Sequence, residues 1–348
     1  MIKLNDHDHP IFGYMFYVAV GMLLTTLVLM LCLALGPGLP GHKTISVGFS
    51  SPAIMSLRLT RVGAAAIVGA TLALSGVLLQ GLLRNPLADP YVLGISSGGA
   101  VGVMVWIVLS STYGAAILAN PWLAELFRYG QTLPALCGAL VACTVVYFLG
   151  QRKGQIDPLT LLLAGVVLGA IGGGLIMLLQ NLVPYGAKTN LLSYLFGYIS
   201  EGTPAVVLWT GLGVLLVGWG LALNLGGALN IAALSDVEAV SLGVRLGRMR
   251  MLAFFCASFL TAGSIALAGP IGFVGLICPH ICRMIFGPEH RRLMLIAPFV
   301  GAIFLMLADT FVRITGSWFA GELPVGVVTA LCGGPFFLYL LSRRRVWE

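Results

Sequence analysis

Residues 61–83, RVGAAAIVGATLALSGVLLQGLL, decide the fold of this chain. After the opening arginine no charge follows until Arg84. About 20 mostly apolar residues suffice for one helix to cross a bilayer. The whole chain has the same character, since 59% of its 348 residues are apolar and only 9% are charged, whereas a water-soluble domain carries about 25% charged residues. The sequence therefore predicts an all-α polytopic membrane protein.

Apolar runs bounded by Pro, Gly and charged residues predict ten transmembrane helices in a single membrane domain over residues 1–348. The third and eighth runs are short and rich in Gly or Pro, so we expect broken or tilted helices there, buried against protein rather than lipid. The ten runs cover residues 11–35, 60–83, 91–110, 131–149, 159–182, 204–225, 250–268, 271–287, 292–312 and 324–342.

The distribution of charge predicts the orientation of the chain. Ten crossings leave both termini on one side, and most of the 19 Lys and Arg residues then fall on that side, including the RRR run at 343–345. Because basic loops stay in the cytoplasm, both termini are predicted to be cytoplasmic. The inner loop at 226–249 is too polar to span and predicts a structured cytoplasmic element. The outer loop at 183–203 predicts a short interfacial helix at about 189–200.

Two similar stretches suggest internal symmetry. LALSG at 72–76 and IALAG at 265–269 each precede a turn that contains proline, and they run in opposite directions across the membrane in this topology. An inverted repeat is typical of transporters that work by alternating access.

The sequence predicts no chemistry of the chain's own. None of the four lysines follows a glycine, so the Walker A loop is absent and the chain does not hydrolyse ATP itself. The basic residues form no stripe with interleaved aromatic residues, which excludes nucleic acid as a partner. The seven cysteines lie within or at the ends of apolar runs, where they act as small hydrophobic residues. We expect no catalytic residue, no metal site and no cofactor.

Asp309 is the main ionisable residue inside a predicted span. Its expected role is a buried hydrogen bond or an ion pair with Arg313, four residues further along the same helix. Two other function classes stay open. One is a proton-coupled secondary transporter that uses Asp309, and the other is a structural membrane subunit of a larger enzyme complex.

Several stretches resemble one family in order along the chain. The first, RLTRVGAAAIVGATLALSGVLLQGLLRNPLADPYVLGISSGGA at 58–100, resembles the amino-terminal signature of the FecCD permeases, the type II ATP-binding-cassette (ABC) importers of ferric siderophores, haem and cobalamin. The later motifs of that family resemble LLLAGVVLGA at 161–170, LNIAALSDVEAVSLGV at 229–244, AGPIGFVGLICPHICRMIFGPEHRR at 268–292, LADTFVR at 307–313 and ELPVGVVTALCGGPFFLYLL at 322–341.

This resemblance implies a non-catalytic permease subunit with ten helices and type II importer architecture in the cell inner membrane. The implied partners are a second permease subunit, expected to be identical, two cytoplasmic ATP-binding subunits and a periplasmic substrate-binding protein. The implied function is import of a metal chelate by alternating access. Family frequency favours a ferric siderophore as substrate, then haem, then cobalamin.

The resemblance also assigns roles at both membrane surfaces. It implies that three arginines at the outer surface dock the binding protein, namely Arg58, Arg61 and Arg313. The alternative is that they are ordinary arginines at helix ends whose charged groups extend to the membrane surface. Coupling to the ATP-binding subunits falls to the inner loop, for which a solvated amphipathic loop is the alternative. The residues expected to make these contacts are Asp236, Glu238, Ala239, Gly243 and Arg245.

The translocation path is expected along the fifth span, 159–182. Its glycines make one stretch slim and smooth, and close helix packing is the alternative explanation: Gly169, Gly172, Gly173 and Gly174. The family's two inner gates fall on two short stretches of this chain. The residues at these stretches are Asn85 and Leu87 in the first, and Asp157, Pro158 and Leu159 in the second.

Overall fold

The computed structural model describes residues 10–37, 45–48, 51–120, 130–152, 154–183, 194–316 and 323–344. Within these ranges eleven α-helices follow one another: α1 (Pro10–Ala34), α2 (Pro52–Leu82), α3 (Ile95–Ala119), α5 (Thr132–Leu149), α6 (Pro158–Gln180), α8 (Ala205–Ala232), α9 (Asp236–Ser241), α10 (Leu246–Ala268), α11 (Val274–Phe286), α12 (His290–Thr315) and α13 (Val325–Arg344). A short 3-10 helix, η1 (Pro90–Leu93), precedes α3. Two antiparallel strand pairs complete the described elements: β1 (Leu35–Pro37) with β2 (Ile45–Val47), and β3 (Gln151–Arg152) with β4 (Gln155–Ile156).

The prediction of an all-α polytopic membrane protein is confirmed. In the described ranges eight helices are apolar and long enough to cross a bilayer: α1, α2, α3, α5, α6, α8, α10 and α12. Two shorter apolar helices, α11 and α13, occupy the eighth and tenth predicted spans. All ten predicted apolar runs therefore coincide with a helix.

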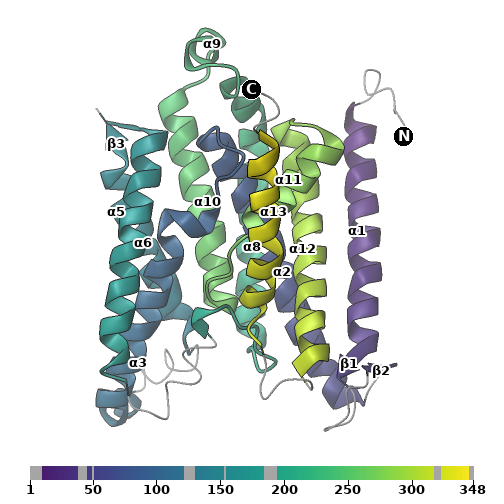
Figure 1. Cartoon of the computed structure of the whole chain (residues 1–348), viewed down its shortest axis with the longest axis vertical. Helices are drawn as coiled ribbons and strands as arrows, with labels where there is room; N and C mark the ends of the chain where they lie inside the picture. Colours follow the sequence, from purple (N-terminus) through teal and green to yellow (C-terminus); the bar gives the residue numbers. More distant parts are fainter. Residues whose placement is uncertain are drawn as a thin grey trace.

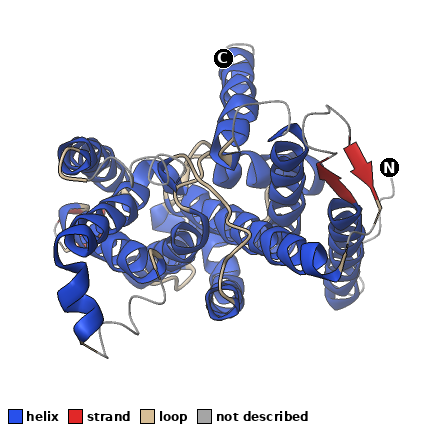
Figure 2. Ribbon diagram, turned by 90° about the horizontal axis from the view of Figure 1, so that it is seen from below, coloured by secondary structure: helices blue, strands red, loops and turns tan. Residues whose placement is uncertain are grey.

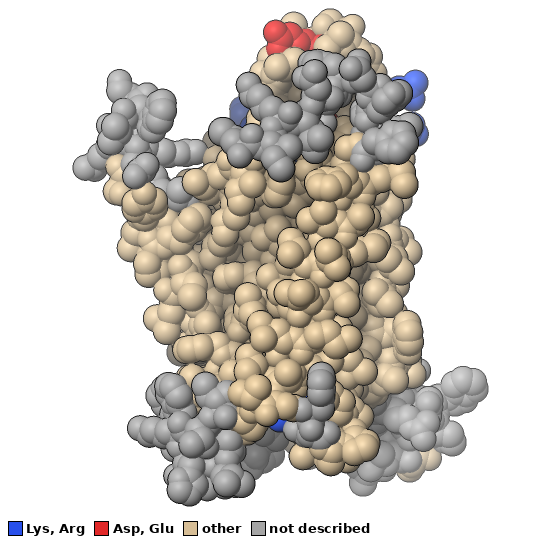
Figure 3. Space-filling view, turned by 90° about the vertical axis from the view of Figure 1, so that its right-hand side faces the viewer, with Lys and Arg blue, Asp and Glu red and all other residues tan. Residues whose placement is uncertain are grey.

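The long helices run side by side along one axis of the molecule (Figure 1). Helix α1 begins and α13 ends at the end where α9 lies, called here the α9 end, and the opposite end carries β1 and β2. Seen from that opposite end, α13 stands at the edge of the bundle (Figure 2), where it packs on α11 and α12. On the face drawn in Figure 3, the described charged side chains lie at the two ends, with an uncharged belt between them. Such a belt suits the hydrocarbon layer of a bilayer.

Helix α2 forms the core of the bundle and packs against α8, α10, α11 and α12. Small residues allow these close approaches. A Cβ atom at Gly69 would overlap the carbonyl oxygen of Gly301 in α12, and a Cβ atom at Gly76 would overlap the carbonyl oxygen of Gly275 in α11. Small residues at helix crossings are the usual way in which membrane helices pack, because lipid supplies no hydrophobic force between them.

The third predicted span differs from the expectation in length. Helix α3 has 25 residues and is not short, although it does contain a kink at Tyr113. The expected break lies before it, since η1 ends at Gly94, whose φ of 72° is a left-handed conformation that glycine adopts without strain. The eighth span is short as predicted. Its helix α11 has 13 residues, or about 20 Å at 1.5 Å per residue.

The two predicted loop elements have different outcomes. Helix α8 continues to Ala232, so the inner element is smaller than the range 226–249 and consists of the six-residue helix α9 with its flanking turns. Residues 189–193 of the predicted outer helix lie outside the described residues. In the described remainder, residues 194 and 195 are helical, 196 is in a turn and 197–200 are irregular.

Candidate functional site

Two adjacent cavities lie beside η1. The cavities measure about 620 and 430 Å³. They share Tyr91, Val92, Leu195 and Pro270, so they are adjacent, and together they are called here the η1 groove. One cavity extends toward α11 and α13, and the other extends between α3 and α6. Concave spaces of this size are where proteins bind small molecules.

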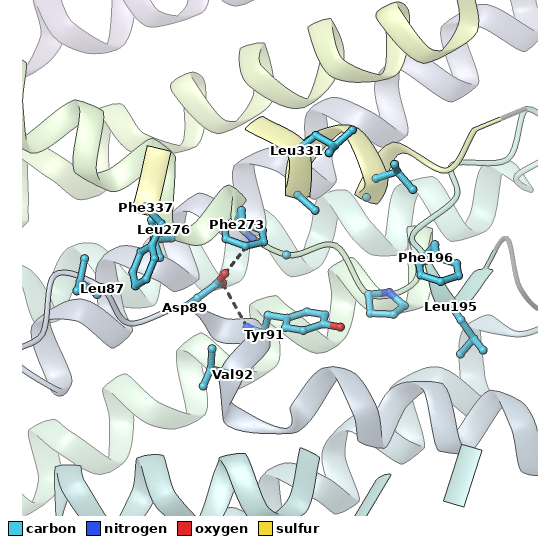
Figure 4. A pocket seen from close by; sticks show the side chains of 15 residues that line it. Leu87, Asp89, Tyr91, Val92, Leu195, Phe196, Phe273, Leu276, Leu331 and Phe337 are labelled. Atoms are coloured by element: carbon cyan, nitrogen blue, oxygen red, sulfur yellow. Dashed lines mark hydrogen bonds between the residues drawn. The ribbon is translucent and has the colours of Figure 1, made fainter. Parts of the chain in front are cut away.

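The wall of the η1 groove is mostly aromatic and aliphatic. Figure 4 shows Tyr91, Phe196, Phe273 and Phe337 among the side chains around the larger cavity. Ser96 and Ser97 of α3 contribute hydroxyl groups to the smaller cavity. The groove thus offers a large, weakly polar surface to a passing molecule.

Asp89 is the acidic residue of this wall, and it was not predicted as a site residue. One carboxylate oxygen accepts the backbone N–H of Tyr91 at 3.2 Å, and the other accepts the backbone N–H of Phe273 at 2.9 Å (Figure 4). One side chain therefore ties the start of η1 to the start of α11. The sequence offered one signal, since an acid inside an apolar stretch must find partners when it is buried.

The predicted path glycines of α6 separate into two groups. Gly169 and Gly173 line the smaller cavity of the η1 groove. Gly172 instead faces α3, where an added Cβ atom would lie 2.8 Å from the side chain of Ser97. Gly174 has open space around it and is not part of the groove wall. Close helix packing, the alternative explanation, therefore accounts for Gly172.

The predicted gate residues lie in two short loops. In the first loop Leu87 lines the groove, and its backbone N–H donates to Oδ1 of Asn85 at 3.0 Å. In the second, Asp157 caps α6 by accepting the backbone N–H of Thr160 at 2.9 Å and the Thr160 hydroxyl at 2.6 Å. These bonds, with the hydroxyl foremost, lower the pKa of Asp157. Pro158 is the first residue of α6, where its fixed φ suits helix initiation, and the Leu159 side chain is 66% exposed.

Helix α9 begins with a side-chain cap at Ser235. The Ser235 hydroxyl accepts the backbone N–H of Glu238 at 3.1 Å and donates to the Glu238 carboxylate at 2.8 Å. Ala239 is buried, and Gly243, with a φ of 84°, closes the following turn. Arg245 is exposed and directly precedes α10. Sequence reasoning missed a feature of this helix, namely a set of exposed apolar side chains in and around it: Leu234, Val237, Val240 and Leu242.

Asp236 points toward the protein's own arginines. Its carboxylate accepts Nη2 of Arg250 at 2.9 Å to each oxygen and also accepts Nη2 of Arg84. Burial on its own raises the pKa of Asp236, but the hydrogen bonds and charges of Arg250 and Arg84 outweigh burial and hold the pKa below its ordinary value. The carboxylate is therefore ionised at neutral pH.

The three outer arginines are buried by their own chain. Arg58 donates to the carbonyl oxygen of Leu33 at 3.1 Å, and Arg313 donates to the carbonyl oxygens of Cys32 and Leu35. Arg61 is only 1% exposed. The guanidinium groups of Arg58 and Arg313 are thus held against the end of α1 and the strand β1.

Asp309 makes the predicted buried hydrogen bond, but its partner is not Arg313, the alternative that the helix spacing suggested. Asp309 instead accepts Nε of Arg61 at 3.0 and 3.3 Å, and Arg61 also donates to Glu201 at 3.2 Å. The residues of the pair are 248 positions apart, so a helix-spacing rule could not identify them. Asp309 is 1% exposed and is absent from the wall of the η1 groove, which does not favour a role as proton carrier along the path.

Known proteins resemble the chain in sequence over most of its length. A family model described as the FecCD transport family matches residues 22–343. The cobalamin import system permease protein BtuC of Halobacterium salinarum is 36% identical over 345 residues, covering 99% of this chain and 85% of the relative. The hemin transport system permease protein HmuU of Yersinia pestis is 36% identical over 295 residues, covering 84% and 83% of the two chains.

One solved structure extends this likeness to three dimensions. It is described as an inward-facing conformation of a metal-chelate type ABC transporter, and it matches with a TM-score of 0.77 at 30% identity, over 95% of this chain and 99% of that one. A family model spanning most of the sequence, relatives above 30% identity and a common arrangement of helices all lead to one conclusion: the chain belongs to the FecCD transport family.

Proposed function

We propose that the chain is the non-catalytic membrane subunit of an ABC importer that moves a metal chelate into the cytoplasm by alternating access. The η1 groove is the observation that carries this proposal. Its wall is mostly apolar, and both oxygens of its acidic side chain, Asp89, are engaged by backbone N–H groups. Transport requires a site that holds a molecule weakly enough to release it. A large and weakly polar groove fits the organic surface of a chelate.

We place two ATP-binding subunits at the α9 end, which is then the cytoplasmic end of a multi-pass inner-membrane protein. Exposed apolar side chains around α9 support this placement, because a protein interface has an apolar centre with a polar rim. Val237 is 81% exposed, and Glu238, Gly243 and Arg245 stand beside the apolar set as rim contacts. In this arrangement both termini of the chain lie in the cytoplasm.

We place a periplasmic binding protein at the β1–β2 end, over Arg58, Arg61 and Arg313. Because Arg58 and Arg313 bind uncharged carbonyl groups while Arg61 is paired with Asp309 and Glu201, we propose that the first two contribute a positive potential and that all three contribute a fixed surface shape. A positive field speeds and orients the approach of an acidic partner. Docking should therefore weaken as ionic strength rises.

We propose a second, identical copy of the chain as the permease partner, facing the open side of the η1 groove. Val166 of α6, which lines the smaller cavity, is 48% exposed in the single chain. Two facing grooves would enclose one path. For the substrate we propose a ferric siderophore, haem or cobalamin, in that order.

Uptake into liposomes tests the function. The chain is reconstituted with its cognate ATP-binding subunit and binding protein, and cobalamin, haemin and ferric citrate are offered in turn with ATP inside the vesicles. We expect uptake of one chelate that stops without the ATP-binding subunit and survives collapse of the proton gradient. Uptake that needs the gradient and not ATP would instead establish the proton-coupled transporter that uses Asp309.

A further inference from the structure

The carboxylate of Asp236 joins α9 to two separate parts of the membrane domain. Arg250, near the start of α10, reaches both of its oxygens at 2.9 Å, and Arg84, just after α2, binds one of them. Arg250 is 11% exposed in its side chain, so it is largely covered by its own protein. Hydrogen bonds between charged groups are shorter and roughly twice as strong as neutral ones.

The same two arginines lead to the two predicted gate loops. Arg84 is directly followed by Asn85 and the groove residue Leu87. Arg250 also donates through Nη1 to the carbonyl oxygen of Ile156 at 3.4 Å, one residue before the cap of α6. One carboxylate is thus connected to the first gate loop through the main chain and to the second through a hydrogen bond.

Both connections are stiff at the gate end. In the second loop Ile156 pairs with Gln151 across the β3–β4 hairpin, and the N–H of Asp157 donates to the carbonyl oxygen of Gly150 at 3.0 Å. In the first, Arg84 has a φ of 47°, a conformation that costs a non-glycine residue energy and persists only when its surroundings hold it. Its bond to Asp236 is one such restraint.

We infer that Asp236 is a positioning residue that transmits movement of α9 to both gate loops, through Arg84 to the first and through Arg250 to the second. This inference rests on the proposed function, in which the ATP-binding subunits move α9. It differs from a direct contact between Asp236 and those subunits, because the two arginines that hold Asp236 then become essential for the response of the gates.

Cysteine labelling of the gate loops tests this inference without knowledge of the substrate. In a background in which the exposed Cys137 and Cys332 are serine, Leu87→Cys reports on the first loop and Leu159→Cys on the second. The full complex with its ATP-binding subunits is placed in nanodiscs, and the rate of maleimide labelling is compared without nucleotide and with ATP plus vanadate. We expect the labelling rate to change at both positions, by about fivefold or more if the coupling is of ordinary size.

The variants separate the two connections. Arg84→Gln should abolish the nucleotide response at Leu87→Cys and spare that at Leu159→Cys, whereas Arg250→Gln should do the reverse. Asp236→Asn should abolish both while ATP hydrolysis continues. Arg248→Gln is the matched control, because this arginine is exposed and lies two residues from Arg250; it should leave both responses intact. The arginine variants decide the matter if Asp236→Asn fails to assemble.

Three results would overturn the inference. The first is a normal response at both loops in Asp236→Asn. The second is loss of the ATP-binding subunits in Asp236→Asn with normal responses in both arginine variants, which would assign Asp236 to direct contact. The third is equal loss in Arg248→Gln. A wild-type complex whose gate cysteines ignore ATP would contradict the proposed function instead.

Discussion

The ion pair between Arg61 and Asp309 fixes the β1–β2 end of the bundle core. Both side chains are 1% exposed, and Asp309 accepts hydrogen bonds from Arg61, so the buried carboxylate depends on this arginine for compensation. Arg61→Gln should leave the Asp309 carboxylate buried and unpaired and lower the free energy of unfolding by about 3–5 kcal/mol. Unfolding in mixed detergent micelles measures this loss.

The double variant supplies the control for this prediction. Arg61→Gln with Asp309→Asn removes both charges at once, so it should cost less than the sum of the two single variants, because residues in contact are not additive. Additive losses would mean that the pair does not stabilise the fold as a unit.

Asp89 connects two breaks in the chain through two backbone N–H groups. Asp89→Asn leaves one carbonyl oxygen to serve both donors, so one of them loses its partner, at a cost of about 1–3 kcal/mol in the free energy of unfolding. Asp157→Asn is the comparison, since asparagine keeps an oxygen that accepts the backbone N–H of Thr160 and is as good an N-cap as aspartate, so it should cost less than about 1 kcal/mol. An equal loss of stability in the two variants would contradict the prediction that Asp89 is needed to hold both backbone N–H groups.

Helices α2 and α12 cross at Gly69 and Gly301. Two glycine replacements within α2 test how tight this crossing is. At Gly69 an added methyl group meets the Gly301 carbonyl oxygen, whereas at Gly63 it meets nothing within 4 Å. Both replacements by alanine bring the same gain in helix propensity, about 1 kcal/mol. Gly69→Ala should nevertheless destabilise the protein, because overpacking costs about 1–3 kcal/mol, while Gly63→Ala should be neutral or stabilising. Thermal unfolding in detergent compares them, and equal unfolding temperatures would argue against a tight crossing.

The positions of the helices were largely predictable from the sequence. Exposing polar groups to lipid is costly, so each membrane helix appears in the sequence as a long run of apolar residues. The start and the length of α3 could not be predicted in this way. The run 91–110 contains no charge that marks a boundary, and the break at Gly94 depends on η1 being held by Asp89 against α11, a contact between distant parts of the chain.

The site was less predictable than the fold, for a geometric reason. Gly172 and Gly173 are neighbours in sequence, yet one packs on α3 and the other lines the η1 groove. Their different roles follow from the position of α3 beside α6, which the sequence does not give. The same holds for Asp236, which sequence reasoning placed at an outside contact. Its pairing with Arg84 and Arg250 arises from three elements that meet at the α9 end.

At the scale of the whole molecule, one chain provides a groove that is open along one side. Its α6 wall is poorly covered, since only 17% of the span's most apolar window is buried in the single chain. A bilayer tolerates exposed apolar side chains, but it cannot carry a bulky chelate along a one-sided groove. This asymmetry between the buried core helix α2 and the exposed helix α6 is what a second copy would complete.

Gly173 offers a direct test of the path, because it lines the groove and has no neighbour that an added Cβ atom would touch. Gly173→Trp should project a bulky ring into the smaller cavity and abolish chelate uptake, while the unfolding temperature and the binding of ATP-binding subunits stay unchanged. Gly174→Trp is the matched control. It adds the same side chain one residue later, also into open space, but outside the groove wall, so uptake should persist. Equal uptake by both variants would place the translocation path elsewhere, and equal loss would mean that bulk anywhere on this face of α6 blocks assembly of the complex rather than passage through it.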